Sequence, residues 1–311
     1  MSEEQSQDPL QRKTSEEFCR RLTSYSRKSK VKTETTGTPR FKIFSKPETQ
    51  LASLIVTWTP DAGKVGSAVA ECLYTKLDGF EFAEVEPIDF FPLDGVIVQD
   101  DVAQFPETKF YFCLRKNLLI LKSDLPRSEW YEFLDTILSI VESTCKVKEI
   151  YVIGGMAAAI AHTTPRMLLA VANSSQTKRM IEHYDLVTDM EYETPEGQRP
   201  TLNSYLLWVA QRRGIPAVNL WVQVPFYLVA CEDPQAWKKV LDFLNDRLEL
   251  DLDFAELSNK ISRQNQKIAQ ARIQHADLDS WLGRLEANLG LDTHESEKLI
   301  RKMEELLGQG D

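Results

Sequence analysis

The chain has 311 residues, of which 42% are hydrophobic and 27% are charged, and its formal net charge is −10 at pH 7. Such values are typical of a globular protein with a hydrophobic core, and an acidic surface disfavours nucleic acid and anionic membranes as partners. The five cysteines form no CxxC pair and are odd in number, which argues against a disulfide framework or a zinc site. The polar N-terminus and the absence of an apolar run of ~18 residues predict a cytoplasmic protein without a membrane span.

Residues 1–39 are predicted to be a disordered polar tail. The segment is rich in Ser, Thr, Lys, Glu and Gln, and it has too few large apolar side chains to offset the entropy of ordering. Residues 1–40 hold nine basic and six acidic residues, so this end is positive while the rest of the chain is acidic. A basic run between Arg20 and Lys32 is the only candidate contact for a polyanion, and a solvated tail is the simpler interpretation.

The folded core is predicted to begin near Phe41. Residues 51–58 form an apolar, β-rich run of strand length that ends in a turn at 59–63. Apolar side chains at helical spacing then predict a helix over 65–77. Further strands are predicted over 80–91, 95–98, 110–114 and 118–122, with a hairpin turn at 115–117.

The second half of the core alternates between helices and strands. Residues 130–141 show the clearest amphipathic helical pattern, and Ser128 is the expected cap of this helix. Another helix is expected over 202–210, and Asp233 marks the start of a third over 234–244. Strands are predicted over 149–153, 166–173 and 217–224.

This alternation predicts an α/β core domain of residues 40–250, with a mixed, largely parallel sheet and helices on both faces in three layers. From about Asp251 the composition changes to charged residues, Gln and Leu, which predicts a C-terminal helical extension of residues 251–311. Its narrow apolar stripes need a partner surface, either the core or a second subunit. The stripes are Phe254, Leu257 and Ile261; Trp281, Leu282, Leu285 and Leu289; and Leu299, Ile300, Met303, Leu306 and Leu307.

The turn at 59–67 joins a predicted strand to a predicted helix, where backbone N–H groups can hold an anion. Its spacing fits neither G-x-x-x-x-G-K-[ST] nor G-x-G-x-x-G, so the signal for a nucleotide is weak. The alternative is a tight turn in which Gly63 and Gly66 allow close packing of the helix.

A second polar segment, residues 154–166, follows the predicted strand 149–153. Ligands of open α/β sheets lie beyond the carboxyl ends of strands, and hydroxyls with an arginine could bind a carboxylate or a phosphate there. The alternative to a ligand site is a glycine-rich crossover in which Arg166 forms an ion pair with an acidic neighbour. His162 could be a general base, and the alternative is a loop histidine without a catalytic role. No catalytic constellation, metal site or cofactor is identified. The candidate ligand-binding residues are Asp61, Gly63, Gly154, Gly155, Thr163, Thr164, Arg166 and Asn219.

Four segments, in the same order along the chain, resemble a known family. They are LIVTWTPDAGKVGSAVAECL at 54–73, FFPLDGVIVQDDVAQFPETKFYFCLRKNLLILKSDLP at 90–126, VIGGMAAAIAHTTPR at 152–166 and GIPAVNLWVQVPFYLVACEDPQAWKKVLDFL at 214–244. Over about residues 50–258 the chain is similar to the family of the second proteasome assembly chaperone and its archaeal and bacterial relatives. Phe226 stands where the family pattern has His.

The resemblance implies an α/β fold similar to nucleoside phosphorylases, self-association into homo-oligomers, and chaperone-like binding of protein subunits. It supplies no catalytic residues. Relatives that dock with proteasomes end in a hydrophobic–Tyr–any-residue tail, whereas this sequence ends at Leu307 to Asp311 without one, so docking by that route is not expected. The N-terminal tail and the helical extension resemble the bacterial members.

Three hypotheses follow. The first is a non-catalytic homo-oligomeric scaffold or assembly-chaperone-like protein, whose partners are itself and protein clients. The second is a small-molecule-binding protein or enzyme, in which Asp61, Arg166 and Asn219 converge on one pocket. The third is a nucleic-acid binder that acts through the basic tail.

Overall fold

The computed structural model describes residues 40–47, 49, 51–87, 90–91, 97–99 and 101–308. Residues 1–39, on which the predicted disordered tail falls, lie outside this part of the chain, so that interpretation stays a prediction. The described residues from Arg40 onward form one compact unit. The predicted boundary between core and extension, near residue 250, falls between helices α6 (Pro234–Leu248) and α7 (Ala255–Gln274).

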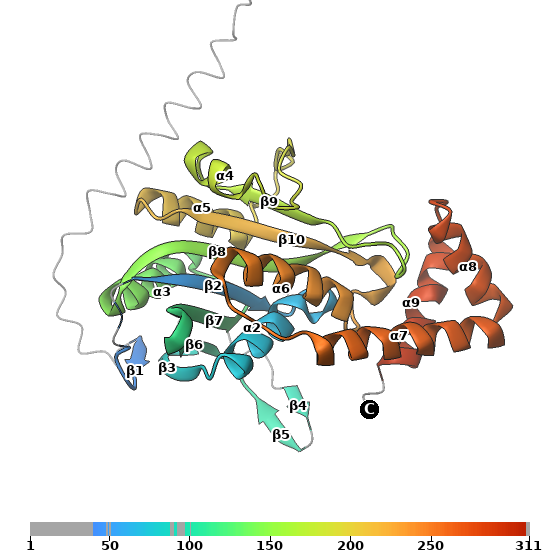
Figure 1. Ribbon diagram of the computed structural model, residues 1–311, viewed down its shortest axis with the longest axis horizontal. Helices are drawn as coiled ribbons and strands as arrows, with labels where there is room; N and C mark the ends of the chain where they lie inside the picture. The colour runs from blue at the N-terminus through green and yellow to red at the C-terminus, as the bar shows by residue number, and fades with distance from the viewer. Residues whose placement is uncertain are drawn as a thin grey trace, which may run out of the picture. The chain divides into compact units, whose positions relative to one another are not determined.

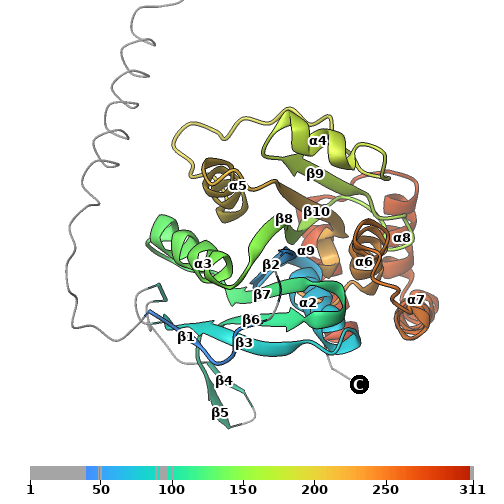
Figure 2. The ribbon, with the colours of Figure 1, turned by 60° about the vertical axis from the view of Figure 1, so that its left-hand side comes forward.

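An eight-stranded mixed sheet lies at the centre of the described chain, in the order β1-β3-β6-β7-β2-β8-β10-β9 (Figures 1 and 2). The central neighbours β7, β2, β8 and β10 run parallel, and the outer pairs run antiparallel, so the mixed sheet is confirmed but is parallel only at its centre. The short strands β4 and β5 form a separate hairpin. The strands are β1 (Phe41–Ile43), β2 (Leu51–Thr59), β3 (Phe80–Val85), β4 (Ile97–Gln99), β5 (Val102–Gln104), β6 (Thr108–Cys113), β7 (Leu118–Asp124), β8 (Lys146–Ala158), β9 (Leu168–Ala172) and β10 (Ala217–Pro225).

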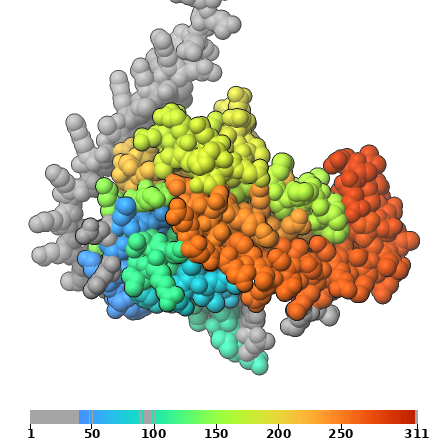
Figure 3. All heavy atoms as spheres, viewed as in Figure 1, coloured from blue at the N-terminus to red at the C-terminus, as the bar shows by residue number. Residues whose placement is uncertain are grey.

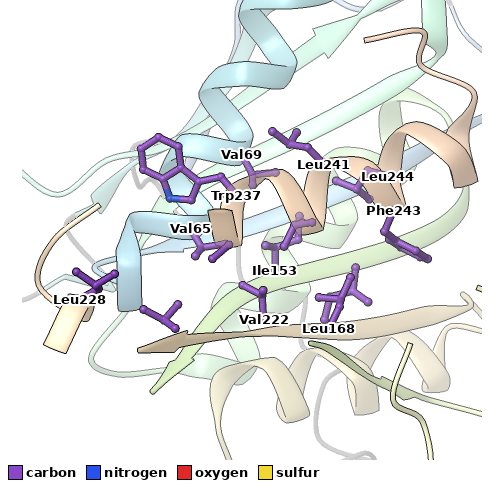
Figure 4. Close-up of a cluster of buried hydrophobic side chains, with 14 of the residues drawn as sticks. Val65, Val69, Ile153, Leu168, Val222, Leu228, Trp237, Leu241, Phe243 and Leu244 are labelled. Carbon is purple, nitrogen blue, oxygen red and sulfur yellow. The ribbon is translucent and has the colours of Figure 1, made fainter. Parts of the chain in front are cut away.

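Helices cover both faces of this sheet because successive strand residues point to opposite sides and both sides are apolar. Helices α2 (Val65–Lys76) and α6 lie on one face; α3 (Trp130–Thr144) and α5 (Leu202–Arg212) lie on the other. Each face has its own buried hydrophobic cluster. Figure 4 shows part of the first, where Trp237 and Leu241 of α6 approach Ile153 and Val222 of the strands. A short helix that the sequence pattern missed, α4 (Ser175–Ile181), follows β9.

The C-terminal helices α7, α8 (Ala276–Glu286) and α9 (Thr293–Leu307) pack within the chain. Their buried side chains join the same cluster as α2 and α6, and α9 lies against η4 (Phe226–Leu228), the turn that follows β10. In Figure 3 the orange spheres of α6 and α7 continue without a break into the red spheres of α8. Within the described residues, no helix is long and apolar enough to cross a membrane. The buried side chains of α8 and α9 are Leu278, Trp281, Leu282, Leu285, Leu299 and Met303.

Three details differ from the sequence-based expectations. The residue that caps α3 is Glu129 rather than Ser128, and it makes no capping bond through its side chain. Leu289, expected in an apolar stripe, is 56% exposed because α8 ends three residues earlier, at Glu286. The strand predicted over 149–153 extends to Lys146–Ala158, so the two glycines at 154 and 155 lie inside β8 rather than in a crossover turn.

Candidate functional site

Asp61 stands at the turn between β2 and α2, where the carboxyl ends of the parallel strands meet. Its Oδ2 accepts hydrogen bonds from the backbone N–H of Gly66 (2.9 Å) and of Gly155 in β8 (3.3 Å). The other carboxylate oxygen, Oδ1, is buried and has no hydrogen-bond partner among the described residues. Burial therefore raises the pKa of Asp61 to about 6, against the opposing effect of the backbone N–H groups of Gly66, Gly155 and Val65. Asp61 thus ties the start of α2 to the middle of the sheet.

Two glycines allow the backbone segments of this turn to approach one another. A Cβ on Gly155 would lie 2.2 Å from the carbonyl oxygen of Ala62, which is a clash with backbone. Gly63 has φ +68°, and its carbonyl accepts bonds from the backbone N–H of Asp233 (3.1 Å) and from Trp237 Nε1 (2.7 Å). Close backbone packing, the alternative weighed for the 59–67 turn, is therefore the arrangement found.

Arg166 and Asp233 form a buried ion pair next to this turn. Arg166 Nε lies 2.9 Å from Asp233 Oδ2, and the side chains are 1% and 0% exposed. Nη1 of Arg166 also donates to the carbonyl of Thr164 (2.6 Å), and Asp233 Oδ1 caps α6 by accepting from the N–H of Ala236 (3.2 Å). All of these partners of the Arg166 guanidinium belong to the same chain. An ion pair between Arg166 and an acidic residue was the alternative to a ligand site in the sequence analysis.

His162 and Thr163 connect the segment after β8 to its surroundings. The N–H of His162 donates to Tyr227 Oη (2.5 Å), and its Nδ1 lies 3.1 Å from the same oxygen. Burial is the main cause that lowers the pKa of His162 to about 4, so the ring is neutral at pH 7. Thr163 Oγ1 donates to Glu286 Oε1 of α8 (3.3 Å), so the C-terminal helices contact this segment directly.

Asn219 lies on the other face of the sheet. Its Oδ1 accepts from Asn203 Nδ2 of α5 (2.9 Å), and Asn203 Oδ1 accepts from Trp58 Nε1 (2.8 Å). Gly154 also faces that side, because a Cβ there would meet Trp221 at 3.6 Å. Asp61, Gly63, Gly155 and Arg166 are therefore brought together, whereas Gly154 and Asn219 are separated from them by the sheet.

The sequence interpretation did not connect Asp233 or Trp237 with this site. Asp233 was assigned only as a helix cap, and Trp237 only as an apolar position. A buried arginine needs a carboxylate partner, and a search for one near Arg166 would have had to consider residues far along the chain. Ligand binding by the candidate residues stays a prediction. Among the described residues, no cluster of three or more His, Cys, Asp or Glu side chains could hold a metal ion.

A polar hollow of about 350 Å³ lies elsewhere, at the amino ends of β2 and β7. Ser53, Lys116, Lys148 and Arg247 are among its lining residues. It adjoins the buried carboxylate of Glu149, which pairs with Arg247 and accepts hydrogen bonds from Ser53 Oγ (3.2 Å) and Tyr151 Oη (2.8 Å). The described cations and carboxylates around this hollow are therefore largely matched to one another.

Comparison with known proteins places the fold. One similar solved structure is a protein of unknown function from Corynebacterium glutamicum, with a TM-score of 0.65 and 17% identity, covering 80% of this chain and 96% of that one. A second is a Mycobacterium tuberculosis proteasome-assembly chaperone homologue, with a TM-score of 0.60 and 18% identity, covering 74% of this chain and 99% of that one. A third is an archaeal proteasome activator from Pyrococcus furiosus, with a TM-score of 0.59 and 20% identity, covering 75% of this chain and 98% of that one. No curated protein matches the chain. The model of the PAC2 family matches residues 55–272, most of the chain. The protein therefore belongs to the PAC2 family, as the four sequence segments suggested.

Proposed function

We propose that this protein is a non-catalytic, homo-oligomeric scaffold with an assembly-chaperone-like role toward protein clients. The observation that supports it is the self-contained bonding at the carboxyl ends of β2 and β8. Asp61 is bonded to two backbone N–H groups there, and Arg166 is bonded to Asp233 and Thr164. The bonds of Asp61 Oδ2 and of the Arg166 guanidinium thus go to groups of the same chain.

The packing of the C-terminal helices supports the same proposal. In open α/β sheets, small ligands bind beyond the carboxyl ends of the strands. Here α9 lies against the η4 turn after β10, and Glu286 of α8 accepts a bond from Thr163 after β8. Helices α8 and α9 thus cover part of the region in which an enzyme of this architecture would bind its substrate.

The family relatives indicate what kind of client to test. One solved relative is described as a proteasome-assembly chaperone homologue and another as an archaeal proteasome activator. We therefore take proteasome subunits as the first candidate clients, bound through the surface of this protein. We propose the cytoplasm as the site of action.

Two measurements test the two parts of this proposal. Sedimentation velocity of the full-length protein across the micromolar range tests self-association, and a single monomeric species at every concentration would contradict it. Mixing the protein with purified archaeal proteasome α and β subunits, followed by native mass measurement, tests the client. The expected result is a complex of fixed stoichiometry with one subunit type, and no complex with either would remove proteasome subunits as clients.

A small-molecule-binding protein of nucleoside-phosphorylase-like fold is the second candidate. The observation in its favour is the buried Oδ1 of Asp61, which has no hydrogen-bond partner in the described part of the chain and which a ligand near residues 154–166 could use as an acceptor. Thermal melting with inorganic phosphate and with nucleosides tests it. A rise in melting temperature in the wild type that is absent in Asp61→Asn would support this candidate, and no rise with either compound class would count against it.

A further inference from the structure

A cluster of aromatic side chains lies on the outer surface of α3 and α5, which run side by side on one face of the sheet (Figure 2). The ring centroids of Trp130 and Tyr205 are 6.4 Å apart, those of Tyr131 and Trp208 6.0 Å, and those of Tyr205 and Trp208 5.4 Å. The four rings therefore form one continuous group across the two helices. We call this group the aromatic patch.

The aromatic patch is open to solvent on its outer side. Tyr131 is 48% exposed, and the other three side chains are half-buried against the hydrophobic cluster beneath them. A helix surface exposed to water is usually covered by charged and small polar side chains. Trp, Tyr and Arg are the residues most enriched where proteins bind one another, since they bury a large area at a low entropic cost. The patch has this composition.

Two opposite charges, neither of which has an ionic partner among the described residues, stand at the two ends of the patch. Glu129, directly before α3, is exposed and makes no ion pair within the described part of the chain. Arg212, at the end of α5, is exposed, and its guanidinium lies 5.3 Å from the centre of the Trp208 ring without a carboxylate partner among the described residues. The next residue, Arg213, differs because it pairs with Asp135 and Glu142.

The two helices run in the same direction, which separates these charges along the patch. Trp130 at the start of α3 contacts Tyr205 near the start of α5, while Arg213 after α5 reaches Asp135 and Glu142 further along α3. The negative end therefore lies at the helix starts and the positive end at the helix ends. A surface with this layout is complementary to a copy of itself that has been turned by two-fold rotation.

We propose that the aromatic patch is the contact between two copies of this chain, related by a two-fold axis that passes near Tyr131 and Trp208. This inference rests on the self-association proposed above and identifies its surface. In such a dimer the rings of the two copies pack on one another, and Glu129 of each copy meets Arg212 of the other. Both ion pairs form at the rim, where they fix orientation more than they add affinity.

The size of the surface sets the expected strength of the contact. A helix of 15 residues, the length of α3, is about 22 Å long. Two neighbouring helices together are about 20 Å wide, so each copy contributes roughly 440 Å² of projected surface. The two copies together reach roughly 900 Å², below the ~1,600 Å² of a standard stable interface, so a dimer in the micromolar range is expected.

Charge reversal provides a test in the full-length protein. Glu129→Arg places two arginines against one another at each rim contact, and Arg212→Glu places two glutamates there. Each single variant is expected to lose dimerisation by at least tenfold in sedimentation velocity. An equimolar mixture of the two variants restores attraction at both contacts, and so does the double variant Glu129→Arg/Arg212→Glu. Both positions are exposed, so the melting temperature of each variant should stay close to that of the wild type.

A matched control uses the same two substitutions on α9. Glu297→Arg and Arg301→Glu reverse charges at exposed positions remote in sequence from the patch, and they should leave dimerisation unchanged. A wild type that self-associates while neither patch variant weakens it overturns this inference and leaves the proposed scaffold intact. Single variants that dissociate but whose mixture does not reassociate also overturn it. A wild type that stays monomeric contradicts both the inference and the oligomeric part of the proposed function.

Discussion

Replacing Asp233 with alanine removes three interactions at once from a fully buried position. The carboxylate accepts hydrogen bonds from Arg166 Nε (2.9 Å) and Nη2 (3.3 Å), and it caps α6 through the N–H of Ala236 (3.2 Å). Leaving one partner of a buried ion pair without the other costs about 3–5 kcal/mol. Loss of a helix cap adds about 1 kcal/mol. We therefore expect Asp233→Ala to lower the free energy of unfolding by about 4–6 kcal/mol, a large share of the ~5–15 kcal/mol of a typical domain.

Two further variants separate the charge from the cap. Arg166→Met combined with Asp233→Ser removes both charges and keeps a capping hydroxyl, and it should cost much less than Asp233→Ala, because an apolar replacement of a whole buried ion pair is often nearly neutral. Asp242→Ala is the surface control on the same helix. It removes only the exposed i,i+4 pair with Lys238 and should cost less than about 0.5 kcal/mol.

Urea unfolding, followed by tryptophan fluorescence and by far-UV circular dichroism, measures all of these variants. Protein concentration is held constant so that self-association contributes equally to each curve. If Asp233→Ala shifted the transition no more than Asp242→Ala, the ion pair would not hold this region together. If the double variant were as unstable as Asp233→Ala, the unpaired charge would not be the cause of the loss.

Three other outcomes are expected. Gly155→Ala, whose Cβ would lie 2.2 Å from the Ala62 carbonyl, should cost about 1–3 kcal/mol or more in urea unfolding, while Gly154→Ala, with its nearest contact at 3.6 Å, should be far milder; equal effects would contradict the close backbone approach. Because the pKa of Asp61 is raised to about 6 in the folded protein, the free energy of unfolding of the wild type should fall as pH rises from about 4 to 6. Asp61→Asn should be more stable than the wild type by ~2–3 kcal/mol above pH 6, and the two should converge near pH 4. Parallel pH profiles of the two proteins would contradict the raised pKa. Burial raises the pKa of Cys113 to about 12, so a thiol reagent at pH 8 should modify it only after unfolding, and labelling of Cys113 in the native protein would contradict this.

Much of the fold follows from local patterns in the sequence. The helix at 130–144 has an apolar face at helical spacing, and the helix at 234–248 begins at Asp233, whose side chain does cap it. The run at 51–59 is buried almost throughout, as a central parallel strand should be. These elements could be predicted because the information that specifies them lies within a few residues.

Other features depend on groups that are distant in the sequence. The pattern alone treats Gly154 and Gly155 as a break, yet β8 continues through them. Gly155 is needed there because the Ala62 carbonyl, from a different segment, leaves no room for a side chain at that position. The partner of the C-terminal stripes was left open, since an apolar stripe does not say whether its partner is the same chain. Asn219 was expected to converge with Asp61 and Arg166 on one pocket, and only the hydrogen bond from Asn203 shows that it faces α5.

The candidate site illustrates the same limit. The pattern grouped eight residues near the predicted strand ends, and the structure brings Asp61, Gly63, Gly155 and Arg166 of these together on one face. A polar residue can serve a ligand or the backbone. Which role applies depends on the atoms opposite, and for Arg166 those belong to Asp233, 67 residues away. The aromatic patch could not be predicted from the sequence pattern either, because its rings come from two helices that are separate in the sequence.

The bonds to Gly63 have a consequence for synthesis of the chain. Its carbonyl is held by the N–H of Asp233 and by Trp237 Nε1, the latter 174 residues later. A ribosome must therefore add 174 residues after Gly63 before the turn after β2 can acquire its bond to Trp237. Contacts between such distant segments form slowly, since a long loop must close first. Until residue 237 emerges, the turn between β2 and α2 lacks its bonds to α6. Chaperones on the ribosome would meet the apolar side chains of these two elements before they are buried.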